Sequence, residues 1–403
     1  MPGALPDGEP VPFDGGLPAS ATADVGARGF GVYVHVPFCA SRCGYCDFNT
    51  YAPGEGVDSA GYADTVLSEL ALAARALDGS VPRVDTVFFG GGTPTLLPPA
   101  ELGRILEGID RTWGLAPGAE VTTEANPESV TPDSLARLRR AGFTRISLGM
   151  QSAAPHVLRV LDRRHTPGRA IQAAREARDA GFEHVNLDLI YGTPGETSAD
   201  FAGSLQAVLD AGVDHVSAYA LIVEDGTRMA ARMRRGELPY PDDDVAADRY
   251  LAADYTLSEA GLDWYEVSNW AAGEAARCRH NLIYWDGGDW WGLGPGAHSH
   301  VGGVRWWNVK HPSAYADRLA RGGSPGQGRE LLTKDERQTE EVMLRLRLAG
   351  GLPLSTLDVA GREAAGRALG DGLLDPARYS AGAAVLTLRG RLLADAVVRD
   401  LLP

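Results

Sequence analysis

The sequence has few cysteines, no long apolar run and no concentrated positive charge, and each shortage excludes a class of protein. No apolar stretch reaches the ~18–20 residues that a helix needs to cross a bilayer, and no secretory signal profile is recognisable at the N-terminus. We therefore expect a cytoplasmic protein, with any membrane association peripheral and made through a partner. The formal net charge is −15 and the arginines are scattered, so we expect no nucleic-acid partner.

Only four cysteines occur, and three of them, Cys39, Cys43 and Cys46, stand within eight residues. In a large chain with no export signal, this clustering favours metal binding over a disulfide framework. The CxxxCxxC spacing in a loop after an apolar run places three thiolates around one [4Fe–4S] cluster and leaves one iron open. A zinc site is the alternative, but structural zinc takes four ligands and no fourth Cys or His stands at finger spacing. Cys278 is isolated, and we assign it no role.

Most of the chain alternates between short apolar runs and amphipathic stretches. The runs predict strands at residues 31–36, 84–89, 120–124, 144–149, 184–190 and 215–221, and helical patterns between them include 62–77, 131–142 and 166–181. Repeated βα units imply a parallel sheet. Six units within about 190 residues predict an α/β fold, an incomplete (β/α)6 barrel with its chemistry at the carboxyl ends of the strands.

Composition changes divide the chain further. Residues 1–28, rich in Pro, Gly, Ala and Asp, predict a disordered extension, and residues 29–260 hold the barrel. Residues 261–330 contain seven of the eight tryptophans and predict an aromatic-rich connecting region, which either accommodates a large flat group or forms an aromatic core. Residues 331–403 predict a small helical or winged-helix-like domain. Its mixed charges favour packing or a lid role over DNA binding.

The segment YVHVPFCASRCGYCDF (33–48), with the motifs that follow, resembles the radical S-adenosylmethionine (SAM) superfamily, specifically its HemN and HemW group. The resemblance covers residues from about 30 to 400. It implies that SAM binds the open iron of the cluster. The cluster and SAM would then supply the radical chemistry, and the protein would position them.

The resemblance also implies which residues contact SAM. The GGGTPT run carries Gly91, Gly92 and Thr93, and its glycines would let backbone amides approach the ligand, although a simple tight turn explains them equally well. Carboxylates accept from amino or hydroxyl groups, and Arg and Gln pair with a carboxylate or ribose. Arg163 would otherwise form a surface salt bridge. The nine predicted SAM contacts are Tyr33, Tyr45, Gly91, Gly92, Thr93, Glu124, Gln151, Arg163 and Asp188.

Within the group, the sequence is closer to HemW, the haem chaperone. HemN-type dehydrogenases carry a further cysteine two residues after the third cluster ligand, where this chain has Phe48, and this departure puts the dehydrogenase activity in doubt. The segment CRHNLIYW (278–285) contains the HNxxYW element that the family associates with haem, so His280 is a candidate axial ligand. The alternative is a hydrogen-bonded structural histidine near the SAM pocket.

Three functions follow from these resemblances. The first is a haem chaperone that carries a [4Fe–4S] cluster and SAM, with haem as its cargo and a haem-requiring protein as its acceptor. The second is an oxygen-independent coproporphyrinogen III dehydrogenase, which would also need an electron donor. The third is a radical SAM enzyme for an unrelated substrate, because barrel motifs report SAM use and say little about the substrate.

Overall fold

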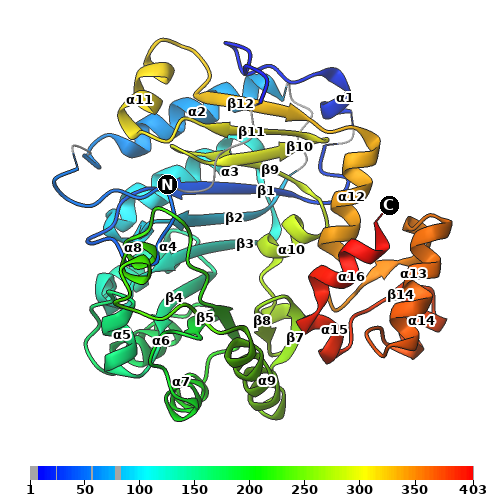
Figure 1. Cartoon of the computed structure of the whole chain (residues 1–403). Coiled ribbons are helices and arrows are strands. Elements are labelled where there is room, and N and C mark those ends of the chain that lie inside the picture. The colour runs from blue at the N-terminus through cyan, green and yellow to red at the C-terminus, as the bar shows by residue number, and fades with distance from the viewer. Residues whose placement is uncertain (1–7, 24, 56–57, 78–82, 403) are drawn as a thin grey trace.

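The structure, a computed structural model, describes residues 8–23, 25–55, 58–77 and 83–402. Its central feature is a twelve-stranded sheet in the order β12-β11-β10-β9-β1-β2-β3-β4-β5-β6-β8-β7 (Figure 1). Among the described residues, no helix is long and apolar enough to cross a membrane.

Six consecutive parallel strands form the middle of the sheet and confirm the predicted α/β fold. The strands are β1 (Phe30–Val36), β2 (Val84–Gly91), β3 (Leu115–Ala125), β4 (Arg145–Gln151), β5 (His184–Tyr191) and β6 (His215–Ala220). Most of their apolar side chains are buried, as expected for parallel strands covered on both faces. β1 and β6 pair outward with other strands, so the six-stranded part remains an open, incomplete barrel.

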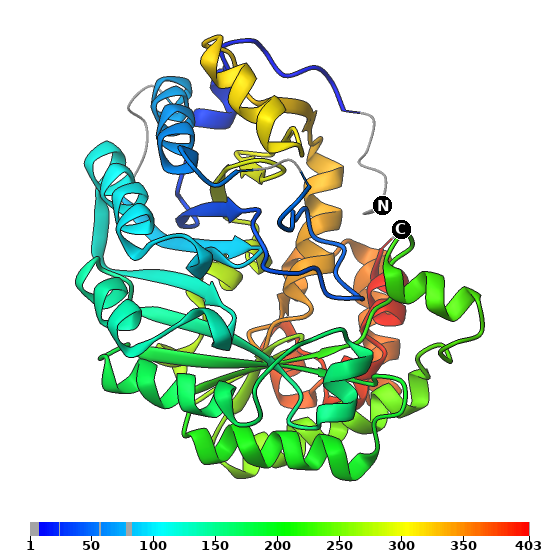
Figure 2. The ribbon, with the colours of Figure 1, turned by 90° about the vertical axis from the view of Figure 1, so that its left-hand side faces the viewer.

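Helices follow these strands and cover the outer face of the sheet (Figure 2). Thr131 and Thr197 each close a capping box at a helix start, which satisfies backbone N–H groups that have no partner within the helix. The elements of this layer are α2 (Tyr62–Ala76), η1 (Pro94–Leu96), α3 (Pro99–Trp113), η2 (Pro127–Ser129), α4 (Pro132–Arg140), α5 (Pro155–Val160), α6 (Arg169–Asp179) and α7 (Ser198–Ala211).

The region predicted to be a connector supplies strands to both edges of the sheet. β7 (Asp263–Glu266) and β8 (Asn269–Ala271) extend it beyond β6, and β9 (Asp289–Leu293), β10 (His298–Val301), β11 (Val304–Asn308) and β12 (Gly326–Leu331) extend it beyond β1. The accompanying elements are α8 (Arg228–Arg234), α9 (Asp243–Glu259), η3 (Glu274–Ala276), α10 (Arg279–Trp285) and α11 (Pro312–Ala320). Trp270, Trp291, Trp306 and Trp307 are buried in this sheet, so these four form an aromatic core.

The prediction that residues 1–28 form a disordered extension is wrong for the part of this segment that the structure describes; residues 1–7 and 24 lie outside the described residues. Glu9 bridges to Arg329 of β12, Ser324 N donates to the Phe13 carbonyl (2.7 Å), and α1 (Ala19–Thr22) buries Ala21. The segment covers the edge strand of the sheet. Pairing with backbone groups, which composition does not report, accounts for the difference.

The C-terminal elements enclose a hydrophobic core of their own. They are α12 (Lys334–Arg345), β13 (Leu352–Pro353), η4 (Leu354–Thr356), α13 (Val359–Gly370), α14 (Pro376–Ser380), β14 (Ala383–Ala384), α15 (Leu388–Leu392) and α16 (Ala394–Leu401). They lie beside β7, β8 and α10 (Figure 1). Arg391 of α15 joins the two parts, because its guanidinium pairs with Asp254 of α9 (2.7 Å) and stacks over Trp264 at 4.4 Å.

Candidate functional site

A cavity of about 840 Å³ opens at the carboxyl ends of β1 to β6. This end of a parallel barrel is where loops from successive strands meet and where sites form. The cavity walls include residues that follow each of the six parallel strands, from Cys39 after β1 to Leu221 after β6. The cavity is therefore the candidate site.

The three motif cysteines lie together in one wall of this cavity. Cys39, Cys43 and Cys46 are half-buried and unpaired, and burial raises the pKa of Cys46 to about 11. The loop that holds them is fixed at both ends, because Cys39 N donates to the Tyr51 carbonyl (3.0 Å) and Met229 N of α8 donates to the Gly44 carbonyl (2.9 Å). The structure thus presents three thiols on a fastened loop.

This thiol arrangement suits a cluster better than one ion. Among the described residues, no group of three or more His, Cys, Asp or Glu side chains converges closely enough to hold a single metal ion. The thiolates of a [4Fe–4S] cluster bind separate irons, so they need not converge on one point. The donor set fits the cluster that the sequence predicts, while zinc would require four convergent ligands.

Eight of the nine predicted SAM contacts line the cavity: Tyr45, Gly91, Gly92, Thr93, Glu124, Gln151, Arg163 and Asp188. Tyr33 does not. Its hydroxyl is hydrogen-bonded to His35 Nδ1 at 3.0 Å, and its ring stacks on Phe88 behind the wall. This placement gives no support to a direct contact of Tyr33 with SAM.

The glycine run contacts protein where the sequence predicted ligand contacts. Gly91 N donates to Glu124 Oε2 (3.1 Å), Gly92 N to the Val36 carbonyl (2.8 Å) and Thr93 N to the Phe38 carbonyl (2.7 Å). A Cβ at position 92 would lie 2.5 Å from the Phe38 oxygen, which explains why glycine stands there. In this structure these amides fasten the β2 turn to Glu124 of β3 and to the chain that leads into the cysteine loop, and a contact of Gly91, Gly92 and Thr93 with SAM stays a prediction.

Two half-buried carboxyls face the cavity. Burial, and then the charge of nearby Asp188, raises the pKa of Glu124 to about 7. Burial also raises the pKa of Asp188, although that carboxyl accepts hydrogen bonds from Ser147 Oγ (2.9 Å) and Asn186 Nδ2 (2.6 Å). A cationic ligand would stabilise both ionised forms. The pair therefore suits the positively charged amino and sulfonium groups of SAM.

Arg163 connects the carboxyl side of the cavity to the cysteine loop. Its Nη1 donates to Cys43 Sγ (3.3 Å), its Nη2 donates to the Gly149 carbonyl (3.0 Å), and its buried Nε finds no partner in the described part of the chain. The alternative of a surface salt bridge is therefore wrong. A buried guanidinium N–H beside the thiols is a donor available for an acidic group. Together with the thiols and carboxyls it fits a cluster and SAM in one cavity.

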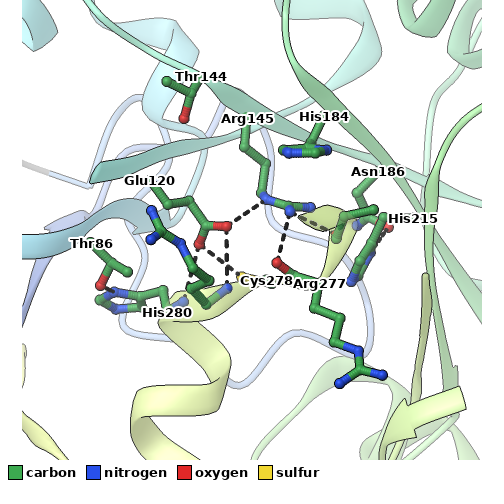
Figure 3. Close-up of polar contacts among 12 residues, drawn as sticks. Thr86, Glu120, Thr144, Arg145, His184, Asn186, His215, Arg277, Cys278 and His280 are labelled. Carbon is green, nitrogen blue, oxygen red and sulfur yellow. Dashed lines mark hydrogen bonds and ion pairs between the residues drawn. The ribbon is translucent and has the colours of Figure 1, made fainter. Parts of the chain in front are cut away.

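A buried ion pair between Arg145 and Glu120 lies beside the cavity (Figure 3). The sequence did not predict this pair. Arg145 Nε donates to Glu120 Oε2 (3.0 Å), and Arg145 Nη2 donates to the carbonyl of Ala276 (2.7 Å). Glu120 also accepts from the backbone N–H of His280 (3.1 Å) at the start of α10. The available signal was a charged residue within each of two predicted strands, Glu120 in 120–124 and Arg145 in 144–149, because a buried charge requires a partner.

His280 is buried where the sequence predicted a haem ligand. Its side chain is part of the packed wall behind the cavity, with the residue only 1% exposed. Nδ1 is hydrogen-bonded to Thr86 Oγ1 (2.7 Å) and Nε2 to the Tyr284 hydroxyl (2.8 Å). Because neither ring nitrogen is free, this geometry contradicts His280 as an axial ligand and agrees with the alternative of a hydrogen-bonded structural histidine.

The GLGPGAHS segment (292–299) holds the cysteine loop from behind. Asn49 Nδ2 donates to the carbonyls of Pro295 (3.0 Å) and Lys310 (2.8 Å). Gly296 has a φ of +77°, and a Cβ there would lie 2.6 Å from Asn49 Nδ2. Asn49 in turn offers its carbonyl to His35 Nε2 at 2.9 Å. The segment therefore positions the loop that carries the thiols.

Comparisons with known proteins agree with this geometry. Residues 33–208 match the Radical SAM superfamily. The chain aligns over 95% of its length with the solved structure of coproporphyrinogen III oxidase (HemN) from Escherichia coli, a radical SAM enzyme, with a TM-score of 0.80, 24% sequence identity and 92% of that chain covered. At this identity the likeness shows the fold.

Curated relatives are closer in sequence. The chain is 58% identical over 375 residues to the heme chaperone HemW of Mycobacterium tuberculosis, covering 93% of this chain and 95% of that one. It is 34% identical over 324 residues to the heme chaperone HemW of Bacillus subtilis, with 79% and 84% covered. Over nearly its whole length, therefore, this chain belongs to the radical SAM superfamily and, within it, to the HemW family.

Proposed function

We propose that this protein is a haem chaperone that holds a [4Fe–4S] cluster on Cys39, Cys43 and Cys46, binds SAM in the adjoining cavity, and delivers haem to a haem-requiring protein. The observation that carries the proposal is the 58% identity, over 93% of the chain, to a protein named heme chaperone HemW. Phe48, at the position of the additional HemN cysteine, supports a chaperone over a dehydrogenase.

In this proposal the chain positions its cofactors with the contacts described above. The cluster, once bound, offers an open iron at which SAM can be chelated and reduced. Arg163 stands between the thiols and the SAM region, and Glu124 and Asp188 supply negative charge for the cationic end of the ligand. Gly92 and Thr93 hold the β2 turn against the chain that leads into the cysteine loop, and Gly91 holds it to Glu124 of β3, so both halves of the site keep a fixed spacing.

The test is an anaerobic haem titration of protein whose cluster has been reconstituted, followed by Soret difference absorbance. Saturable, near-stoichiometric binding is expected, and the loaded protein should pass its haem to a haem-free acceptor protein when the two are mixed. Absence of saturable binding with an intact cluster would contradict the chaperone.

The second candidate function is coproporphyrinogen III dehydrogenase. It is suggested by the similarity of the fold to that of HemN. It requires an electron donor and productive SAM cleavage. Anaerobic incubation with coproporphyrinogen III, SAM and a low-potential reductant, followed by product analysis, distinguishes the two. Decarboxylated product at catalytic turnover would establish the dehydrogenase, and we expect none.

A further inference from the structure

We propose that haem lies across the mouth of the cavity on an apolar ledge formed by Phe48, Leu96, Tyr219 and Ile222. The inference rests on the proposed function, because it gives the haem cargo a site in this chain. It replaces His280, whose ring nitrogens are both hydrogen-bonded inside the protein.

The ledge residues are large, exposed apolar side chains that all line one cavity. Ile222 is 69% exposed, Phe48 61%, and Leu96 and Tyr219 42% each, and all four line the same cavity. Isolated exposed apolar residues are ordinary on protein surfaces, but several around one opening mark a binding site. Their concentration at the cavity mouth indicates a ligand with a large apolar face.

The positions of these residues in the fold bring them to the open side of the barrel. Phe48 belongs to the cysteine loop after β1, and Tyr219 and Ile222 stand at the end of β6, so they come from the first and the last of the six barrel strands. Tyr45 of the cysteine loop packs into the same hydrophobic cluster as Leu221. The chain after β1 and the chain after β6 therefore approach each other at the cavity.

The cavity has two chemically different halves. Glu124, Asp188, Ser147 and Asn186 form a polar deep half that suits SAM, whereas the mouth carries the apolar ledge. SAM has one flat ring, its adenine, which is too small to cover four exposed apolar side chains from different loops. A planar tetrapyrrole, with its broad apolar ring, matches the mouth.

The charges at the mouth suit the acidic edge of haem on one side. Arg164 lines the cavity, is exposed, and has no ion-pair or hydrogen-bond partner in the described part of the chain. Arg42, also in the lining, already pairs with Glu55 (3.1 Å). Asp47 and Glu224 line the cavity too, so the haem carboxylates should point toward Arg164.

The experiment compares haem affinity among exposed-residue variants of the full chain with its cluster reconstituted. Phe48→Glu combined with Ile222→Glu should raise the haem Kd at least about tenfold, because two large apolar contacts are replaced by charges that must be desolvated. The matched controls are Tyr255→Glu and Val359→Glu, which change an exposed aromatic and an exposed aliphatic residue away from the cavity. They should shift Kd less than about twofold.

Two further measurements separate the ledge from a metal-ligand site. Iron-free protoporphyrin IX, titrated by fluorescence, should lose affinity in the ledge variant to the same degree as haem, because the ledge contacts the ring. His280→Phe should bind haem within about twofold of wild type. Cluster iron and far-ultraviolet circular dichroism confirm that each variant is folded and loaded.

Failure of the inference is distinguishable from failure of the proposed function. If wild type binds no haem saturably, both are overturned. If wild type binds haem but the ledge variant binds as tightly as the controls, the ledge is overturned and the chaperone function stands. If His280→Phe weakens haem binding and the ledge variant binds haem as tightly as wild type, the ledge is also overturned.

Discussion

Glu124 Oε2 accepts a hydrogen bond from the backbone N–H of Gly91 over 3.1 Å, which fastens the end of β3 to the glycine turn after β2. The same carboxyl faces the cavity near Asp188. One side chain therefore both holds the turn in place and contributes charge to the site. Because the pKa of Glu124 is about 7, its protonation near that pH should weaken the binding of cationic SAM.

The first prediction concerns SAM affinity and pH. Burial and the neighbouring charge raise the pKa of Glu124 to about 7, so the carboxyl is mostly protonated at pH 6 and mostly ionised at pH 8. Since cationic SAM favours the ionised form, its affinity should rise by about tenfold from pH 6 to pH 8. Calorimetric titration measures this, and Glu124→Gln should remove most of the slope; an equal slope in that variant would contradict the assignment.

The second prediction concerns the cluster ligands. Replacing Cys39, Cys43 or Cys46 by Ala should abolish the iron content and brown colour of anaerobically prepared protein, because three thiolates are the minimum that holds a cluster with an open iron. Cys278→Ala is the matched control, since this buried thiol lies near Glu120 and away from the loop. Stoichiometric iron in any of the three loop variants would refute the ligand set.

The third prediction concerns the segment behind the cysteine loop. Gly296→Ala places a Cβ 2.6 Å from Asn49 Nδ2 and should lower the yield of reconstituted cluster and speed its loss in air. Gly261→Ala is the control, because Gly261 also has a positive φ of +83° but nothing lies within 4 Å of its Cβ. Both should lose about 1–2 kcal/mol of stability from backbone strain. Equal cluster yields in the two variants would show that Asn49 does not position the loop.

The fourth prediction concerns the docking of the C-terminal elements. Arg391→Ala removes the pairing with Asp254 and the stacking on Trp264, both largely shielded from water, and should lower the free energy of unfolding by about 1–3 kcal/mol. Urea unfolding followed by tryptophan fluorescence measures the loss. Arg389→Ala, which removes only an exposed bond to the Asp371 carbonyl, should cost less than about 0.5 kcal/mol.

The strands and the cavity residues could be predicted because their signals are local. Apolar runs marked the six parallel strands, and the polar residues at strand ends marked the cavity, since the ends of parallel strands meet at one edge. The positions that sequence reasoning misplaced depend on contacts distant in the chain. His280 resembles a ligand until Thr86 and Tyr284 are seen to occupy both nitrogens.

The ion pair of Arg145 with Glu120 illustrates the same limit. Glu120 lies within β3 and Arg145 begins β4, and the sequence contains no indication of which residue neutralises either charge. Only the register of β3 against β4, with Thr122 opposite Arg145, brings the two side chains together. Pairing between strands is set by the whole sheet, so a local pattern reports a buried charge without its partner.

The N-terminal segment that covers β12 has a consequence for how the protein behaves when shortened. Residues 9–16 lie along the last strand, because Glu9 bridges to Arg329 of β12 and the Phe13 carbonyl accepts a hydrogen bond from Ser324, just before β12. A chain that begins at Gly29 would keep the whole of β1 but leave the outer edge of β12 without this cover. Unpaired edges recruit strands from other molecules, so the shortened protein should self-associate and aggregate while its cofactor-binding cavity remains intact.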